Sequence, residues 1–369
     1  MEEQFRKLAT IRKIKEIRPI EGADAIELAV VDGWNVVVAK NVGHKVGDKV
    51  VYCEIDSFLP IREEFEFLRK SSYKKMGDQE GFRLKTIRLR GQISQGLILP
   101  YSIIPIAQFA TAYDLPEGMD VSEMLGIVKY DPPIPAQLAG KIKGGFPGFL
   151  RKTDEERCQN LASEYQRWRA NPELGFYTTE KLDGSSFTCY LKDGQFGVCS
   201  RNLELAEPEP FVPGLVMCDD GIERPRQENT FWKVVREMGI REKLEKACQE
   251  LGKNLCIQGE MIGEGIQGNP YKIKGQTLRL YNIFDIDSQE YMDLPMFLST
   301  AENVLEIPTV PVLEMNFELP ETIEDLLAYA EGKSVLNKDT EREGVVIRSH
   351  DRKVSFKAIS NKFLLGSKE

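Results

Sequence analysis

A stretch rich in proline and glycine divides the chain into two parts of different character. It contains Asp131-Pro132-Pro133-Ile134-Pro135 and Gly144-Gly145-Phe146-Pro147-Gly148, and this composition argues against regular structure. Short β-strands are expected before it, and a mixture of strands and helices after it. A chain of 369 residues is long enough for two or three domains. We therefore predict an α+β protein with an all-β domain (1–130), a linker (131–150) and a mixed domain (151–369).

The first part has the pattern of a small β-barrel. Residues 25–31 and 35–39 are apolar runs separated by the turn signal Asp32-Gly33, which is typical of a hairpin. Further short strands follow at 49–55, 82–90 and 92–99, with glycine turns between them. Strands of this length and spacing predict an OB-fold barrel.

Basic residues alternate with apolar ones on one of these strands. They are Arg83, Lys85, Arg88 and Arg90. OB barrels often bind single-stranded nucleic acid along a basic groove, so these side chains are candidates for phosphate contacts. Charges on a solvated strand edge, where they discourage aggregation, explain the pattern equally well.

Composition excludes several classes of site. The seven cysteines are odd in number and form no C-x-x-C pair, which argues against a disulfide framework and a zinc site. The only histidines are His44 and His350, so a histidine-based metal centre is not expected. The net charge of −9 argues against broad duplex binding by bulk charge, although a local basic groove is compatible with it.

The chain carries no membrane or export signal that the sequence reveals. No apolar run reaches the length of a membrane span, and the N-terminus, Met1-Glu2-Glu3-Gln4-Phe5, is polar. We expect a soluble, intracellular, cytoplasmic protein without a membrane partner, and a monomer.

The second part is organised around Glu180-Lys181-Leu182-Asp183-Gly184. Residues 176–179 and 187–191 are expected strands on either side, which places Lys181 at a junction between strand and turn. Such a position suits a nucleophile that points into a pocket. A Lys-x-Asp-Gly pattern also occurs by chance, and a surface lysine in a turn is the alternative.

The rest of this part is predicted to place further strands and helices around that turn. We expect a hairpin of residues 187–191 and 195–200, a surface loop over 202–229 and a helix over 230–251. A strand (255–262), a glycine-rich loop (263–275), a buried strand (278–286), a helix (322–331) and a closing hairpin (344–348 with 353–357) follow.

A further helix is expected just before the lysine strand. Thr153 followed by Glu156 has the spacing of a capping box, which predicts a helix from Thr153 through Arg169 with Arg157 on its first turns.

Several charged and aromatic residues stand at or near the ends of these strands. They are Arg201, Glu260, Tyr281, Phe284, Glu343 and Lys357. Together with Lys181 they resemble, in order, the motifs of the covalent nucleotidyltransferase superfamily of ligases and capping enzymes. The resemblance implies an antiparallel-sheet, ATP-grasp-like ligase domain, and catalytic roles for Lys181, Asp183, Glu260, Glu343 and Lys357.

The resemblance also implies the residues that hold the nucleotide. ATP would contact Glu180, Lys181, Arg157, Arg201, Glu343 and Lys357, and either Tyr281 or Phe284 would stack on adenine. Taken singly, each residue has an ordinary structural explanation: an ion pair for Glu260, a turn for Glu343, the core for Phe284 and a solvated face for Arg157.

The more specific resemblance is to ATP-dependent RNA ligases that carry an N-terminal OB domain. It rests on Lys152-Thr153-Asp154-Glu155, on residues 263–269, and on Ser94-Gln95-Gly96-Leu97 in the first part. The chain departs from some relatives in the last motif, where Ser355 stands at the first of two lysine positions. Lys353 is the alternative cation there.

Elementary chemistry agrees with these implied roles. A lysine at its ordinary pKa of about 10.4 is protonated and cannot attack phosphorus, so it needs a nearby cation or loss of solvent. Carboxylates and water suit Mg²⁺ or Mn²⁺. Asp183, Glu260 and Glu343 are the candidate metal ligands, directly or through water.

The resemblance implies an enzyme that joins RNA ends through a lysyl-AMP intermediate. The expected substrate is a nick in a duplex with RNA on its 3′-OH side, as in RNA repair. The alternatives are a capping guanylyltransferase, a DNA ligase, and an RNA-binding relative without catalysis.

Overall fold

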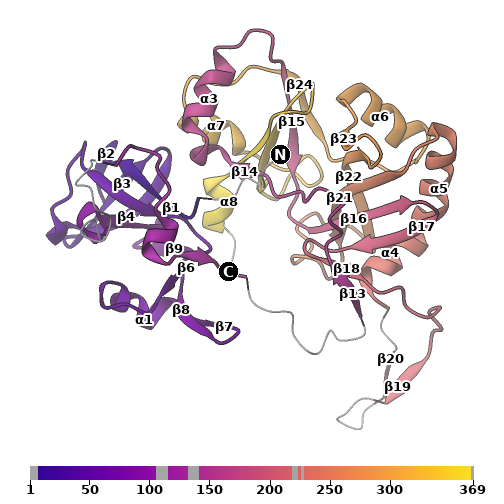
Figure 1. Cartoon of the computed structure of the whole chain (residues 1–369), viewed down its shortest axis with the longest axis horizontal. Coiled ribbons are helices and arrows are strands. Elements are labelled where there is room, and N and C mark those ends of the chain that lie inside the picture. The colour runs from indigo at the N-terminus through magenta and orange to yellow at the C-terminus, as the bar shows by residue number, and fades with distance from the viewer. Residues whose placement is uncertain (1–6, 105–114, 132–140, 218–222, 226–227, 367–369) are drawn as a thin grey trace. The chain divides into compact units, whose positions relative to one another are not determined.

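The computed structural model describes residues 7–104, 115–131, 141–217, 223–225 and 228–366. The chain divides into two compact units, Met1–Ile134 and Pro135–Glu369. In Figure 1 the colour follows the sequence, from indigo at the N-terminus to yellow at the C-terminus.

The first unit is built almost entirely from short strands, shown in indigo to purple in Figure 1. They are β1 Ala9–Lys13, β2 Glu16–Pro19, β3 Ile26–Val31, β4 Trp34–Ala39, β5 Lys49–Cys53, β6 Ser57–Pro60, β7 Tyr73–Met76, β8 Gln79–Arg83, β9 Thr86–Leu89, β10 Gln92–Gln95, β11 Leu97–Pro100 and β12 Val128–Lys129. Short helices α1 (Arg69–Ser72) and α2 (Ser122–Leu125) interrupt them. In the described residues the strands form sheets β1-β5-β11, β2-β3-β4, β12-β6-β8-β7 and β10-β9.

The predicted hairpin of this unit is confirmed. β3 and β4 pair antiparallel, and the turn residues Asp32 and Gly33 both have positive φ, 45° and 80°, as a two-residue hairpin turn requires. The core beneath holds Trp34 and Tyr52, whose ring centroids lie 5.6 Å apart.

The second unit consists of two large sheets with helices on their outer faces. Its strands are β13 Ile142–Gly145, β14 Glu156–Arg157, β15 Phe176–Lys181, β16 Ser185–Lys192, β17 Gln195–Cys199, β18 Leu203–Leu205, β19 Leu215–Met217, β20 Glu223–Pro225, β21 Leu255–Gly263, β22 Gln276–Asp285, β23 Glu290–Tyr291, β24 Val312–Phe317, β25 Gly344–Ser349 and β26 Ser355–Ile359. Within the described residues one sheet has the order β13-β18-β17-β16-β21-β22-β23 and the other β14-β26-β25-β15-β24. β19 and β20 form a separate ribbon that projects from the unit in Figure 1.

Each large sheet has its own layer of helices and its own core. Helices α4 (Thr230–Met238), α5 (Ile240–Leu251) and α6 (Leu294–Asn303) pack on the larger sheet. Helices α3 (Ala162–Arg169) and α7 (Ile323–Ala330) pack on the smaller one (Figure 1). A last helix, α8, spans Asn361–Gly366. The chain crosses from the smaller sheet to the larger one between β15 and β16, at residues 182–184, so the lysine motif lies where the two sheets meet.

The predicted local elements of this unit are largely confirmed. β16 and β17 form the expected hairpin about Asp193 and Gly194, both with positive φ. β22 is the expected buried strand, and Thr322 caps α7 by accepting from the Asp325 amide. β25 and β26 form the closing hairpin.

Three local predictions are wrong. Residues 142–145 form β13 and pair with β18, so part of the expected linker is a strand. The expected surface loop over 202–229 is also wrong, because it contains the strands β18, β19 and β20. The helix expected over 230–251 is two helices, because Gly239 adopts a left-handed φ of 61° that ends α4.

The capping-box prediction also fails. Residues 156–157 form β14, which pairs parallel with β26. A short 3-10 helix, Cys158–Asn160, follows, and the α-helix begins only at Ala162. The Glu156 carboxylate accepts hydrogen bonds from the Arg157 amide and from Asn160 Nδ2. It therefore stabilises the turn over residues 156–160 and does not take part in a capping box.

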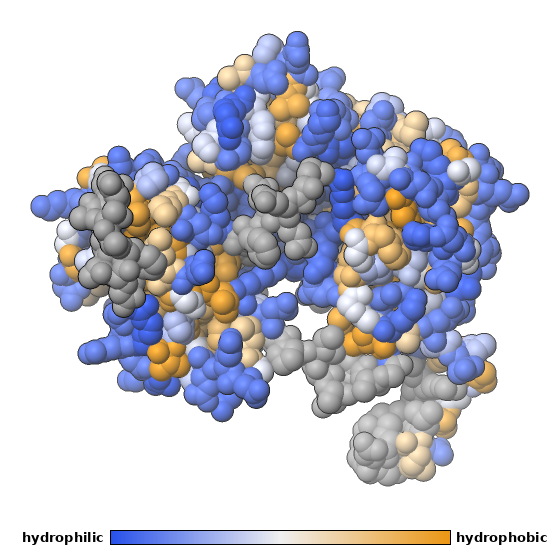
Figure 2. Space-filling view, viewed as in Figure 1, coloured by the Kyte–Doolittle hydropathy of each residue, from blue (hydrophilic) through white to orange (hydrophobic). Residues whose placement is uncertain are grey.

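The surface is mainly hydrophilic on the face seen in Figure 2. None of the helices in the described residues combines the length and apolar character that crossing a bilayer requires.

Candidate active site

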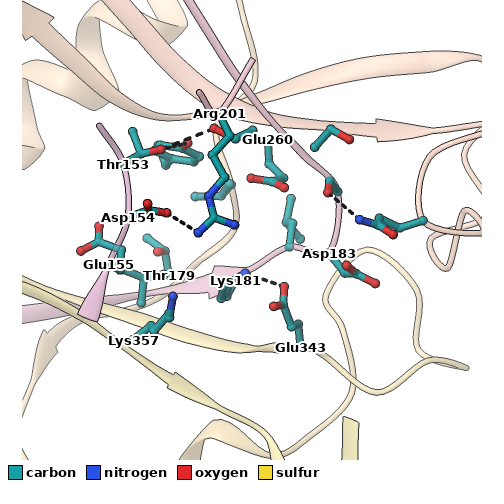
Figure 3. Close-up of a pocket in the computed structure, with 18 of the residues that line it drawn as sticks. Thr153, Asp154, Glu155, Thr179, Lys181, Asp183, Arg201, Glu260, Glu343 and Lys357 are labelled. Atoms are coloured by element: carbon teal, nitrogen blue, oxygen red, sulfur yellow. Dashed lines mark hydrogen bonds and ion pairs between the residues drawn. The ribbon is translucent and has the colours of Figure 1, made fainter. Parts of the chain in front are cut away.

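A pocket of about 560 Å³ lies in the second unit, where the two sheets meet at the lysine motif. Its lining comes from three segments, residues 153–155, 179–186 and 200–203, and from single positions further along the chain. The last group is Phe231, Glu260, Gln267, Tyr281, Val310, Glu343, Val346, Arg348 and Lys357. Figure 3 shows Arg201 and Glu260 on one side of this pocket and Lys181, Glu343 and Lys357 on the other.

Strand pairing brings Lys181 and Glu343 together. β15 pairs antiparallel with β25, and Lys181, the last residue of β15, lies opposite Gly344, the first residue of β25. Glu343 directly precedes that glycine, so its carboxylate reaches the lysine. The Nζ atom donates to Glu343 Oε2 at 2.7 Å, with 26% of the lysine side chain exposed.

Gly184 is required because the turn after the lysine passes close to β21. A Cβ atom on Gly184 would lie 2.4 Å from the carbonyl oxygen of Met261 and 2.8 Å from Glu260 Cγ, distances that atoms in contact do not reach. The turn therefore fits against β21 only without a side chain at this position. This close approach also brings Asp183 toward Glu260.

Glu260 is placed in the pocket by its register in the larger sheet. It lies on β21 opposite Ser186 of β16. Burial, together with the negative charges of Glu343 and Asp183, raises the pKa of Glu260 to about 8, although the Lys181 charge opposes this.

The acidic groups around the lysine repel one another. Burial, and then the charge of Glu343, raises the pKa of Asp183 to about 6. Burial alone would lower the pKa of the Lys181 ammonium, but the three neighbouring carboxylates outweigh it and raise that pKa. The lysine is therefore held protonated, and a group that competes for these carboxylates would release it.

The carboxylates of Asp183, Glu260 and Glu343 are suitable ligands for a divalent cation, but they are not close enough to one another to form a complete metal site. Carboxylates with raised pKa values gain most from a nearby positive charge. Among the residues that the structure describes, no three His, Cys, Asp or Glu side chains lie close enough to hold a metal ion by themselves. Direct coordination by all three predicted ligands is therefore not preformed.

The predicted phosphate-binding cations are placed differently from one another. Lys357 lines the pocket on β26, and burial together with the charges of Lys181 and Arg157 lowers its pKa to about 8. Arg201 also lines the pocket and forms an ion pair of 2.6 Å with Asp154 (Figure 3). Arg157 lies opposite Lys357 in the β14–β26 pairing, outside the lining.

Lys353, the alternative cation of the last motif, lies outside the pocket. Its side chain is 83% exposed and lies within 3.7 Å of Asp351.

The two candidates for adenine stacking are separated by the structure. Tyr281 lines the pocket, and its hydroxyl donates to Thr153 Oγ1 at 3.2 Å. Phe284 is fully buried on the same strand and packs with Tyr190 and Cys256 in the core. Phe284 is not among the residues that line the pocket, so Tyr281 is the better placed of the two for stacking.

The Glu180 side chain contacts the segment that precedes β25. Its buried carboxylate accepts from the amide of Val335 at 2.8 Å, and burial raises its pKa. It thus holds the loop that leads to Glu343.

Several residues that line the pocket were not among the predicted site residues, and they include Thr153, Glu155, Thr179 and Arg348. The buried Arg348 guanidinium donates to Thr179 Oγ1 at 3.1 Å and to Glu155 at 3.2 Å. Alternation along β25, which sends Val346 and Arg348 to the same face, was a usable signal for Arg348.

Comparison with known families agrees with this architecture. A family model described as an OB-fold domain matches residues 8–101, and a model described as RNA ligase matches residues 175–359. No match was found among curated proteins.

Solved structures of a Naegleria gruberi RNA ligase are similar over nearly the whole chain. A mutant with ATP and Mn is 42% identical, with a TM-score of 0.78, over 99% of this chain and 100% of that one. A second mutant, with AMP and Mn, is 43% identical with a TM-score of 0.78, over 97% and 98% of the two chains. A complex with PPi is 43% identical with a TM-score of 0.76, over the same shares.

The fold is that of an RNA ligase with an OB-fold domain before a sheet-rich second unit. The chain belongs to the RNA ligase family. The α+β fold expected from the sequence is confirmed.

Proposed function

We propose that this RNA ligase uses ATP to join a 3′-OH end to a 5′-phosphate through AMP linked to Lys181. The observation that carries the proposal is the Lys181 ammonium in a pocket, 2.7 Å from Glu343 and beside Asp183 and Glu260. A lysine surrounded by carboxylates and bordered by Lys357 and Arg201 suits attack on a phosphate that brings its own cation.

Three transfers account for the reaction. The neutral Nζ attacks the α-phosphorus of ATP, a P–N bond forms, and the P–O bond to pyrophosphate breaks. An oxygen of the RNA 5′-phosphate then takes the AMP group, and the P–N bond breaks. Finally the 3′-OH attacks the activated 5′-phosphate, which forms the phosphodiester and releases AMP.

Asp183, Glu260 and Glu343 are the residues that would hold Mg²⁺ or Mn²⁺, with water or phosphate oxygens completing the shell. The cation would lower the pKa of the lysine and neutralise charge on the α-phosphate. The relatives solved with ATP and Mn or with AMP and Mn support this choice.

The remaining pocket residues would hold the nucleotide. Lys357 and Arg201 would bind the α-phosphate and later the RNA 5′-phosphate, with Arg157 supporting Lys357 from the neighbouring strand. The Tyr281 ring would stack on adenine. Glu180 would act by fixing the loop before Glu343.

The substrate we propose is a nicked duplex with RNA on the 3′-OH side. Residues 151–369 would carry the nucleotidyl transfer. The OB-fold domain, residues 1–130, would dock the strand that ends in the 3′-OH, in keeping with the habits of OB barrels. The protein would act as a monomer.

Labelling with ATP tests the lysine. The protein is incubated with ATP labelled in its α-phosphate and Mn²⁺, and label that stays on the denatured protein is measured. We expect label on the wild type and on Lys192→Ala, a control on the adjoining strand β16, and none on Lys181→Ala. Labelling of Lys181→Ala would overturn the proposal.

Competition and nick sealing test the substrates. Excess unlabelled GTP should not reduce the labelling of the protein by ATP. A capping guanylyltransferase would use GTP in preference to ATP, so GTP would suppress the labelling. Nicks with RNA at the 3′-OH side should be sealed faster than all-DNA nicks, and the reverse order would favour a DNA ligase. An RNA-binding relative without catalysis would bind the nick and take up no label.

A further inference from the structure

One loop makes hydrogen bonds to the backbone of two consecutive residues, Asp183 and Gly184, in the turn that follows the lysine. The loop connects β21 to β22 and comprises residues 264–275; we call it the clamp loop. The Asp183 amide donates to the Tyr271 hydroxyl at 2.5 Å, and Gln267 Nε2 donates to the carbonyl oxygen of Gly184 at 3.3 Å. The turn is therefore held through its backbone.

The Tyr271 ring is fixed in place by apolar packing. It is 5% exposed and belongs to a small cluster with Leu182, Ile262 and Val310. Leu182 is the spacer of the Lys-x-Asp-Gly motif, so ring and turn pack on each other as well as sharing a hydrogen bond. Tyr271 does not line the pocket, and any effect on the reaction must pass through the turn.

The clamp loop is closed by hydrogen bonds between its own residues. Asn269 Nδ2 donates to the Ile273 carbonyl at 2.8 Å, and the Ile273 amide donates back to Asn269 Oδ1 at 3.0 Å. Three non-glycine residues of the loop, Gln267, Asn269 and Lys272, adopt left-handed φ values of 46°, 51° and 54°. Such a backbone is maintained only where the surroundings determine it.

The clamp loop also contacts the segment that leads to Glu343. Asn337 Nδ2 donates to the Pro270 carbonyl at 2.8 Å, one residue from Tyr271. Lys272 and Asp339 add an ion pair of 2.8 Å, but both side chains are about 70% exposed or more, so it contributes little. The clamp loop thus contacts both the turn after Lys181 and the segment that precedes Glu343.

We propose that Tyr271 is a positioning residue for nucleotidyl transfer to Lys181, acting through the Asp183 amide; this rests on the function proposed above. The hydroxyl gives that amide its acceptor and fixes the turn, so that Lys181 and Asp183 face the same space. Without it the amide loses its partner and the turn gains alternative conformations. Because a displacement of about 1 Å can cost about 100-fold in rate, the effect should be on the transfer step.

The test compares two substitutions that each remove one phenolic oxygen. Tyr271→Phe keeps the packed ring and removes the acceptor. Tyr329→Phe is the control, since its hydroxyl lies 2.9 Å from Thr178 Oγ1 on the same strand as Lys181 and outside the turn. Single-turnover label transfer is measured against ATP concentration with Mn²⁺, together with the thermal midpoint.

Tyr271→Phe should slow transfer at saturating ATP by about 10-fold or more, with the half-saturating ATP concentration and the thermal midpoint close to those of Tyr329→Phe. A rate equal to that of Tyr329→Phe, or a change confined to half-saturation, overturns the proposal. If Tyr271→Phe does not fold, Gln267→Met, which removes the second contact to the turn, must slow transfer; an unchanged rate then overturns it.

The two proposals fail in different ways. Absence of label on the wild-type protein would refute the lysine mechanism itself. Normal wild-type labelling with an unimpaired Tyr271→Phe would refute only the positioning role.

Discussion

Lys181 Nζ lies 2.7 Å from the Glu343 carboxylate. The contact joins the end of β15 to the start of β25, residues 162 positions apart in the chain. As long as this ion pair is intact, the lysine keeps its proton. The proposed transfer of AMP to Lys181 therefore requires that another positive group engage the Glu343 carboxylate at the moment of attack.

Glu343→Gln separates two roles of this carboxylate. If Glu343 only held the lysine protonated, its loss would lower the pKa of Lys181 and speed transfer. If it also holds a cation beside the phosphate, transfer should fall by about 100-fold or more, the size expected for loss of a charged group at the reacting centre. We expect the fall.

Label transfer between pH 6 and 9 with Mn²⁺ measures this. Glu318→Gln, at an exposed position, is the matched control and should retain wild-type rates. Faster transfer in Glu343→Gln would contradict a cation-holding role.

Lys357 should give the reaction an alkaline limit. Burial and the neighbouring cations lower its pKa to about 8, so the side chain is charged below that pH and loses its charge as pH rises through it. Steps that need a cation at the phosphate should weaken over the same range. Lys357→Arg, which stays charged, should move the decline of joining to higher pH.

The pH profile from 7 to 10 is the measurement, and its shape matters more than the absolute rate. Lys353→Arg, at an 83% exposed side chain, should leave the profile unchanged. If Lys353→Arg moved the alkaline limit and Lys357→Arg did not, Lys353 would be the functional cation.

Glu260 should lower the stability of the protein as pH rises. Its pKa is raised to about 8 in the folded state from an ordinary value of about 4.3. Between these values the folded state keeps a proton that the unfolded state loses, so folding becomes less favourable as pH increases. The thermal midpoint of the metal-free wild type should therefore fall from pH 5 to pH 8.

Glu260→Gln should reduce that fall while abolishing label transfer. Each kcal/mol of change in the free energy of unfolding should move the thermal midpoint by about 2–4 °C. Adding Mn²⁺ at pH 8 should raise the midpoint of the wild type more than that of the variant. Equal pH slopes in the two proteins would show that Glu260 ionises normally.

Gly184→Ala should disrupt the turn. The added methyl group would lie 2.4 Å from the Met261 carbonyl oxygen, a backbone atom of β21, so turn or strand must move. We expect a stability loss of about 1–3 kcal/mol and at least about 10-fold slower label transfer. Gly148→Ala is the control, because its Cβ meets nothing within 4 Å, and similar effects of both changes would argue against this close approach.

Local signals in the sequence were enough where a structure is decided by neighbouring residues. The hairpin about Asp193 and Gly194 and the cap of α7 by Thr322 both follow from the conformational preferences and hydrogen bonds of a few adjacent residues. Gly239 carried a similar signal, but its position inside an apolar helical pattern concealed the break that its left-handed φ makes.

Other choices depended on partners far along the chain. Thr153 and Glu156 fit a capping box, yet pairing with β26 makes residues 156–157 a strand. Tyr281 and Phe284 are both aromatic residues near a strand end, and only the packing of β22 shows that Tyr281 faces the pocket and Phe284 the core.

The order of the strands, the Lys-x-Asp-Gly turn and the acids and lysines that follow it can all be read from the sequence. That Lys181 lies opposite Gly344 and next to Glu343, and that the Asp183 amide donates to Tyr271, emerges only in the folded chain. Sheet register and close packing depend on contacts between distant segments, whereas turns and caps depend on a few neighbouring residues.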